Sequence, residues 1–190
     1  MHTRRLSSFL LGAWLAASLF MSAVAAGNFR AVDRLLDTPS KAASEHIKKL
    51  GKDSTRALLR YQVSELNRYY FDQWELVQLC LGALLAVVLL FATNGNRLAM
   101  ALSVFMVLLV VIQHWLVGPQ VLALGRLLDF TSANAPLAQR TQFMAHHRAY
   151  LVVEGLKLLA GVVLTVRLLV AVSAGRRRRR TGEAEPVLDA

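Results

Sequence analysis

Residues 98–117 read LAMALSVFMVLLVVIQHWLV and contain no Asp, Glu, Lys or Arg. A helix needs about 20 mainly apolar residues to cross a hydrocarbon core of about 30 Å, and this stretch meets that length. The buried segments of a soluble protein would carry polar residues at helical or strand spacing within such a run. The stretch therefore predicts a helix that spans a membrane.

Three further blocks have almost the same character, and apolar residues make up 55% of the 190-residue chain. These blocks are Leu6–Ala26, Leu76–Thr93 and Tyr150–Ser173. We therefore predict an all-α membrane protein with four transmembrane helices in one bundle. The predicted spans are 7–26, 74–93, 98–118 and 149–173, within a single domain at 1–174.

The first block has a second interpretation. AVAAG at residues 23–27 resembles the A-x-A cleavage site of a signal peptide. The apolar run before it is longer than the roughly 7–15 residues of a signal sequence, so we expect an uncleaved span. Cleavage would leave the other three spans in the same orientation.

Residues 27–73 predict a helical region outside the membrane. The apolar spacing of residues 28–37 continues the first helix, and the residues from Asp37 to Ser40 are typical of a break and a restart. A short helix is expected at 40–50, ended by Gly51. Asp53 and Ser54 are expected to cap a third helical segment, which runs without a breaker into the second span.

Four spans place both termini on the same side of the membrane. The net charge is +10, and much of the excess of basic residues sits in Arg176–Arg180, directly after the fourth span. Basic residues favour the cytoplasmic side. Lys and Arg within 27–73 oppose this assignment, but we predict an N-in, C-in protein of a bacterial inner membrane. Residues 175–190 are expected to form a flexible tail, first polybasic and then acidic. The arginines expected to contact lipid headgroups, rather than nucleic acid, are Arg176, Arg177, Arg178, Arg179 and Arg180.

Aromatic side chains mark the expected outer boundary of the membrane. Tyr69, Tyr70 and Trp74 precede the second span, and Trp115 lies near the end of the third. Such amphipathic rings favour the headgroup region. We therefore predict that these four residues are membrane-interface anchors.

Polar residues within the spans predict a cluster in the outer half of the bundle. At 1.5 Å per residue, His114 and Glu154 lie roughly 5–8 Å below the outer boundary. Glu154 and Lys157 share a helical stripe with His147 and with Tyr150 or Leu151. The predicted intramembrane polar cluster comprises His114, His147, Glu154, Lys157, Glu75 and Gln78. Its members either form a functional site or fix the register of the helices.

No catalytic chemistry is evident. The chain has no recognisable nucleophile–base pair and no spaced set of metal ligands, so we expect neither an enzyme nor a bound cofactor. Haem between His114 and His147 is a weaker alternative, as is zinc held by histidines and a carboxylate. Zinc is disfavoured because the adjacent His146 and His147 point in different directions on a helix.

Three stretches resemble the transmembrane protein 205-like family, whose members carry a domain of unknown function. They are LLGAWLAASLFMSAVAAGNFRAV at 10–32, HWLVGPQVLAL at 114–124 and RTQFMAHHRAYLVVEGLKLLAG at 140–161. The positions that match the family are Trp14, Pro119, Phe143, His147 and Glu154. The resemblance implies a four-helix membrane fold and no established chemistry.

Two functions are compatible with these observations. We expect a structural or accessory subunit that docks to other membrane proteins. The alternative is a binder of a small molecule or cofactor at the polar cluster. The expected partners are membrane lipids and other membrane proteins or further copies of the chain, but not nucleic acid.

Overall fold

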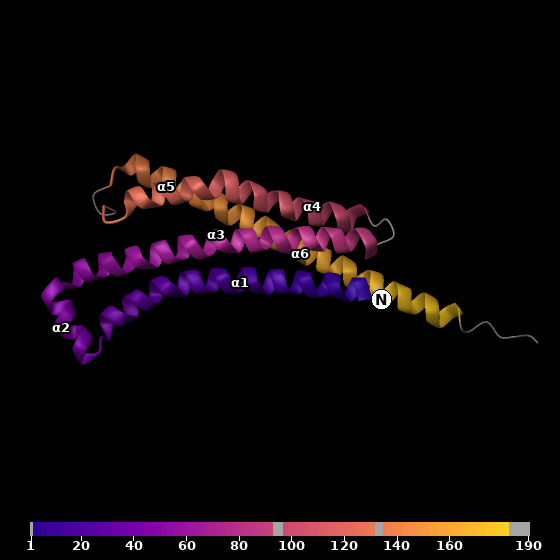
Figure 1. Cartoon of the computed structure of the whole chain (residues 1–190), viewed down its shortest axis with the longest axis horizontal. Helices are drawn as coiled ribbons and strands as arrows, with labels where there is room; N and C mark the ends of the chain where they lie inside the picture. Colours follow the sequence, from indigo (N-terminus) through magenta and orange to yellow (C-terminus); the bar gives the residue numbers. More distant parts are fainter. Residues whose placement is uncertain (1, 93–96, 132–134, 183–190) are drawn as a thin grey trace, which may run out of the picture.

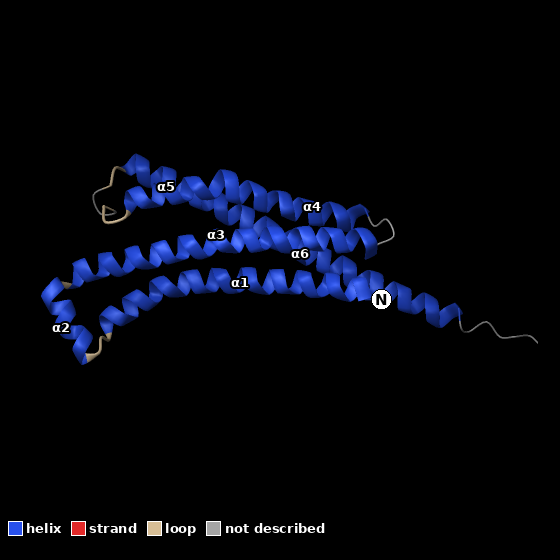
Figure 2. Cartoon of the chain, in the orientation of Figure 1, coloured by secondary structure: helices blue, strands red, loops and turns tan. Residues whose placement is uncertain are grey.

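The structure, a computed structural model, describes residues 2–92, 97–131 and 135–182 (Figure 1). Every regular element within these residues is helical (Figure 2). The elements are α1 (His2–Asp37), α2 (Lys41–Leu50), α3 (Lys52–Ala92), α4 (Arg97–Ile112), the π-helical turn η1 (Gln113–Val117), α5 (Gly118–Leu128) and α6 (Leu137–Gly182).

Four of these helical stretches are long and apolar enough to cross a membrane, which confirms the predicted all-α bundle. They are Arg5–Asp37, Lys52–Phe91, Arg97–Leu128 and Leu137–Val170. The short helix α2 connects the first two, as expected. Figure 1 shows the start of α1 and the last described part of α6 toward the same end of the bundle, opposite α2.

The apolar core lies in the half of the bundle away from α2. Because lipid tails are as apolar as leucine, membrane helices associate through close packing rather than through a hydrophobic driving force. Trp14 of α1 is 1% exposed, and its ring lies directly over Gly82 of α3, where a Cβ would come within 2.7 Å. Other fully buried side chains of the core are Leu11, Leu85, Leu89, Met106 and Leu164.

The turn around α2 follows the expected capping chemistry. The Ser40 hydroxyl accepts a hydrogen bond from the Ala43 N–H at 3.3 Å, which satisfies a free donor of the first turn. Gly51 adopts a φ of 85°, a conformation that favours glycine, and joins α2 directly to α3. Because α3 already begins at Lys52, Asp53 lies in its first turn and is not the predicted cap.

Residues 28–73 form a projecting arm, which consists of the end of α1, α2 and the first part of α3. The 41 residues of α3 reach about 60 Å, whereas a hydrocarbon core measures about 30 Å. The helix α3 is therefore about twice as long as one crossing of a hydrocarbon core requires. In Figure 1 the arm carries α2 at its tip.

Side-chain contacts between α1 and α3 stiffen the arm. Asp33 accepts a hydrogen bond from Arg60 at 3.2 Å and lies 3.8 Å from Arg56. Closer to the bundle, the Asn28 amide donates to Asn67 at 2.8 Å. The arm is thus a pair of mutually supported helices.

Two helices run beyond the ends of the predicted spans. The helix that contains the third span continues past residue 118, because η1 passes into α5, and Pro119 lies in the first turn of α5, where its missing N–H is tolerated. The fourth helix continues to Gly182, so residues 175–182, expected to belong to the tail, are helical. The side chains of Arg176–Arg180 and all of 183–190 lie outside the described part of the chain.

Candidate functional site

A buried polar cluster lies where the apolar bundle meets the projecting arm. It is built by α3, η1 and α6, with one residue from α1. Its members are Ser18, Glu75, Gln78, Gln113, His114, Tyr150, Glu154 and Lys157. Each helix presents them on one face, because the polar residues follow one another at three-and-four spacing or are adjacent in the π-helical turn.

Lys157 is the centre of one hydrogen-bonded chain. Its side chain is 1% exposed, and its Nζ lies 2.7 Å from Glu154 Oε2, one turn earlier on α6. The same Nζ donates to Gln78 Oε1 at 2.5 Å, and Gln78 Nε2 donates to Ser18 Oγ at 3.1 Å. The predicted Glu154–Lys157 pair is therefore present, and its chain of contacts links α6 through α3 to α1.

Glu75 is the centre of a second chain. Its side chain is 5% exposed. The Tyr150 hydroxyl donates to Oε1 at 2.6 Å, and His114 Nδ1 lies 2.9 Å from Oε2. His114 Nδ1 also lies 3.7 Å from Asp72 Oδ1, and the Asp72 side chain is 54% exposed. This chain connects the buried carboxylate to the surface of the protein.

The π-helical turn places two adjacent residues in the cluster. Gln113 Nε2 donates to Glu154 Oε2 at 3.4 Å, while its neighbour His114 contacts Glu75. Glycine at 118 leaves room for the wide turn, since a Cβ there would lie 3.0 Å from the Gln113 carbonyl oxygen. Gln113 is fully buried and its side-chain oxygen has no hydrogen-bond partner among the described atoms. π-Helical turns are frequent at functional sites.

The structure brings together five of the six residues expected to form the cluster, namely Glu75, Gln78, His114, Glu154 and Lys157. His147 makes no hydrogen bond or ion pair with these five, and its ring stacks on Phe143 with centroids 5.7 Å apart. Sequence reasoning missed Gln113 and Ser18, and it named Tyr150 only as one of two candidates on the stripe with Glu154. Gln113 could have been identified from the sequence, since it is a polar residue next to His114 in an otherwise apolar stretch.

Three of the predicted interface aromatics are exposed: Tyr69, Tyr70 and Trp115. Trp74 is partly buried, and its indole nitrogen is buried without a hydrogen-bond partner among the described atoms. The exposed rings are therefore available to a headgroup layer, whereas Trp74 also packs within the protein.

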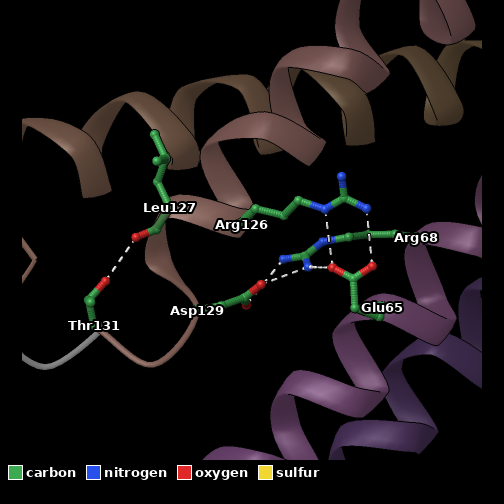
Figure 3. Close-up of polar contacts among 6 residues, drawn as sticks. All are labelled: Glu65, Arg68, Arg126, Leu127, Asp129 and Thr131. Atoms are coloured by element: carbon green, nitrogen blue, oxygen red, sulfur yellow. Dashed lines mark hydrogen bonds and ion pairs between the residues drawn. The ribbon is translucent and has the colours of Figure 1, made fainter.

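A second group of charges, which we term the clasp, ties the arm to the end of α5 (Figure 3). It consists of Glu65, Arg68, Arg126 and Asp129. Arg68 donates to both Asp129 oxygens, at 2.8 and 3.2 Å, and to Glu65 at 2.5 Å. Arg126 donates to both Glu65 oxygens at 3.2 Å. Such bidentate contacts fix the relative orientation of the guanidinium and carboxylate groups as well as their distance.

The aromatic contact beside the clasp strengthens the same junction. Phe130 follows Asp129 with a φ of 61°, a left-handed conformation that is uncommon outside glycine. Its ring lies 4.9 Å from that of Tyr61 on α3. The turn after α5 is thus held against the arm by charge pairs and by an aromatic contact.

The geometry of the polar cluster suits the holding of charge and protons. Among the described residues, no three His, Cys, Asp or Glu side chains are placed to bind one metal ion. The buried groups instead form acid–base contacts, of which His114 with Glu75 and Lys157 with Glu154 are the closest.

Comparison with known proteins gives no relative for this chain. No protein-family model matches it, and neither a curated protein nor a solved structure is similar to it. The resemblance to the transmembrane protein 205-like family therefore stays a prediction.

Proposed function

We propose that the protein is an accessory membrane subunit, without catalytic chemistry of its own, that docks through its projecting arm to the water-exposed part of another membrane protein. The observation that carries this proposal is the arm itself. It is preorganised by contacts between α1 and α3, yet apolar side chains remain exposed on its outer surface. The polar cluster would then serve to hold the bundle that carries the arm.

The exposed apolar side chains of the arm include a stripe on α3. Leu58 is 52% exposed and Leu66 is 41% exposed. Leu66 follows Leu58 by eight residues, which corresponds to a rotation of about 80° around the helix axis. Both side chains therefore lie on one side of α3, and Tyr69 projects at an angle between them. Exposed apolar patches that face water are typical of interaction surfaces.

The rigidity of the arm favours tight docking. Ordering a flexible segment on binding costs free energy for each immobilised side chain. The arm avoids much of this cost, because the Asp33 and Asn28 contacts and the clasp already hold it in one arrangement.

The charge of the arm indicates the chemistry of the partner. Residues 28–73 contain nine Lys or Arg and six Asp or Glu, a net charge of +3. Asp33, Asp37 and Asp53 are engaged in ion pairs within the arm. The partner surface should therefore be acidic around an apolar centre, since complementary charge steers association.

We further propose that the protein lies in a bacterial inner membrane with both termini in the cytoplasm and the arm outside. The arginine run at 176–180 supports this, because it directly follows the fourth span. Fusion of a fluorescent protein that folds only in the cytoplasm to the C-terminus should yield fluorescence. A dark fusion of normal abundance would reverse the orientation.

The docking proposal is tested by native mass spectrometry of the protein purified gently from its own host membranes. The wild-type chain should carry one partner protein at a fixed ratio. Leu58→Glu combined with Leu66→Glu should reduce the recovered partner at least tenfold, because burial of each leucine contributes roughly 1.5–3 kcal/mol. Gln142→Glu, an exposed position on α6 outside the arm, is the matched control and should leave recovery unchanged.

The outcomes separate the proposal from its rivals. A bare chain from several mild detergents and from lipid nanodiscs would refute docking, and so would full recovery of the partner by the double variant. A small bound mass would instead favour the second candidate, a ligand at the polar cluster. One observation supports that candidate, namely the unpartnered buried oxygen of Gln113.

A further inference from the structure

The charges of the polar cluster do not balance if every group has its ordinary protonation state. Lys157 neutralises Glu154 at 2.7 Å. The Glu75 side chain is also buried, at 5% exposed. Among the described residues, the only ion-pair partner within 4.0 Å of its carboxylate is His114. A histidine is mostly uncharged at neutral pH, since its ordinary pKa is about 6.5. The cluster would then hold one uncompensated buried carboxylate.

The surroundings of Glu75 do not supply the missing charge. On its own helix, the nearest charged neighbour is Asp72, which is also acidic. From α6 it faces the neutral Tyr150 hydroxyl and, farther away, the already paired Lys157. The helix α1 carries no charged residue between Arg5 and Arg30 and so offers none here. An isolated ionised carboxylate away from water is expensive, and such a group takes up a proton instead.

We propose that Glu75 and His114 form a proton-binding site that holds one proton more than a carboxylate and a neutral imidazole. The 2.9 Å separation of Nδ1 and Oε2 suits two placements of that proton. Either an imidazolium faces a carboxylate, or a carboxylic acid donates to a neutral imidazole. Both placements leave the pair with no net charge, and the proton belongs to the pair rather than to one residue.

The proton reaches the pair from the side of the arm. Asp72 is half exposed and lies 3.7 Å from His114 Nδ1, which itself lies next to Glu75. Toward the opposite side of the bundle, the described residues offer no further buried ionisable group beyond Lys157. The site therefore binds a proton with one-sided access and does not conduct protons across the membrane.

Proton binding couples the protonation state to helix packing at the root of the arm. The pair joins α3 to η1, and Tyr150 joins the same carboxylate to α6. Loss of the proton leaves a net negative charge among three helices. Their packing is thus tightest while the proton is bound.

A spectroscopic experiment on the full-length wild-type chain in lipid nanodiscs tests the site directly. At pH 8, free histidine is neutral and free glutamate is ionised. Nitrogen-15 NMR of the histidine rings and carbon-13 NMR of the glutamate carboxyls should show either an imidazolium at His114 or a protonated carboxyl at Glu75. Assignment uses His114→Asn and Glu75→Gln. A neutral His114 together with an ionised Glu75 would overturn the proposal.

The pH dependence of the unfolding equilibrium provides a second measurement. Above pH 7 the folded pair holds a proton that the unfolded chain lacks, so stability falls as pH rises. The wild-type unfolding constant should rise about tenfold per pH unit between pH 7 and 8 relative to that of Glu75→Gln. Glu45→Gln on α2 should keep the wild-type slope. Equal slopes for wild type and Glu75→Gln would contradict the proposal.

Discussion

Removal of the Lys157 ammonium is the sharpest test of how the bundle is held together. Lys157→Met keeps the length and apolar stem of the side chain but removes its charge. The variant leaves Glu154 without its 2.7 Å partner and Gln78 Oε1 without its 2.5 Å donor. The bundle must then hold an unpaired carboxylate or give Glu154 a proton.

The expected magnitude follows from that choice. Protonation of a carboxyl with an ordinary pKa of about 4.3 costs about 3.7 kcal/mol at pH 7, because each pH unit corresponds to 1.36 kcal/mol. Loss of one partner of a buried ion pair costs about 3–5 kcal/mol in soluble proteins. Hydrogen bonds between membrane helices average only about 0.6 kcal/mol. We therefore expect a loss of about 3 kcal/mol at pH 7, dominated by the stranded charge.

A double-mutant cycle separates the two contributions. Unfolding free energies are measured in one lipid mixture for wild type, Lys157→Met, Glu154→Gln and the double variant. The double variant should recover most of the loss, because no buried charge is stranded. The deficit of Lys157→Met should also shrink by about 1.4 kcal/mol for each unit by which the pH is lowered from 7 to 5.

Two results would refute this reasoning. A loss below about 1 kcal/mol would mean that the ammonium contributes no more than an average hydrogen bond between membrane helices. A loss that does not change with pH, and that Glu154→Gln does not relieve, would mean that Lys157→Met disturbs packing rather than charge.

Two further predictions concern packing and the clasp. Gly82→Ala should lower the unfolding free energy by about 1–3 kcal/mol, because its Cβ would lie 2.7 Å from the Trp14 ring, whereas Gly12→Ala meets nothing within 4 Å and should change little. Thermal unfolding in detergent distinguishes these variants, and similar losses for both would contradict the close contact between Gly82 and Trp14. Arg68→Ala should speed hydrogen exchange in the turn after α5, and Arg126→Ala should do so less because its side chain is 57% exposed; equal effects would contradict the ranking of the two arginines.

Much of the fold could be predicted because the membrane imposes strong constraints. A chain in lipid must satisfy its backbone hydrogen bonds internally, so uncharged stretches such as 98–117 are expected to form helices. The short helix α2 was also predictable, since Ser40 and Gly51 are typical residues at helix ends. The third helix was not predicted to continue past Pro119, because the accommodating π-helical turn depends on local packing.

The depth of the polar residues along their helices could be predicted, but only some of the contacts between their side chains could. Charges inside a membrane helix are costly, so Glu154 and Lys157 were expected to face inward and did pair. Depth also placed His114 and Glu154 at one level. The structure instead pairs His114 with Glu75, while Gln113 contacts Glu154. Depth along a helix follows from residue count, whereas the direction of each side chain depends on the rotation of the helix.

The clasp illustrates what no local pattern reveals. Arg68 and Asp129 are 61 residues apart, and each resembles an ordinary surface charge in its own segment. The residue patterns alone were enough to predict four helices long and apolar enough to cross a membrane, a helical region between the first two and a gathering of polar groups near one end. Which charges meet could not be predicted, because helix rotation, the turn at η1 and the left-handed Phe130 are set by packing between distant segments.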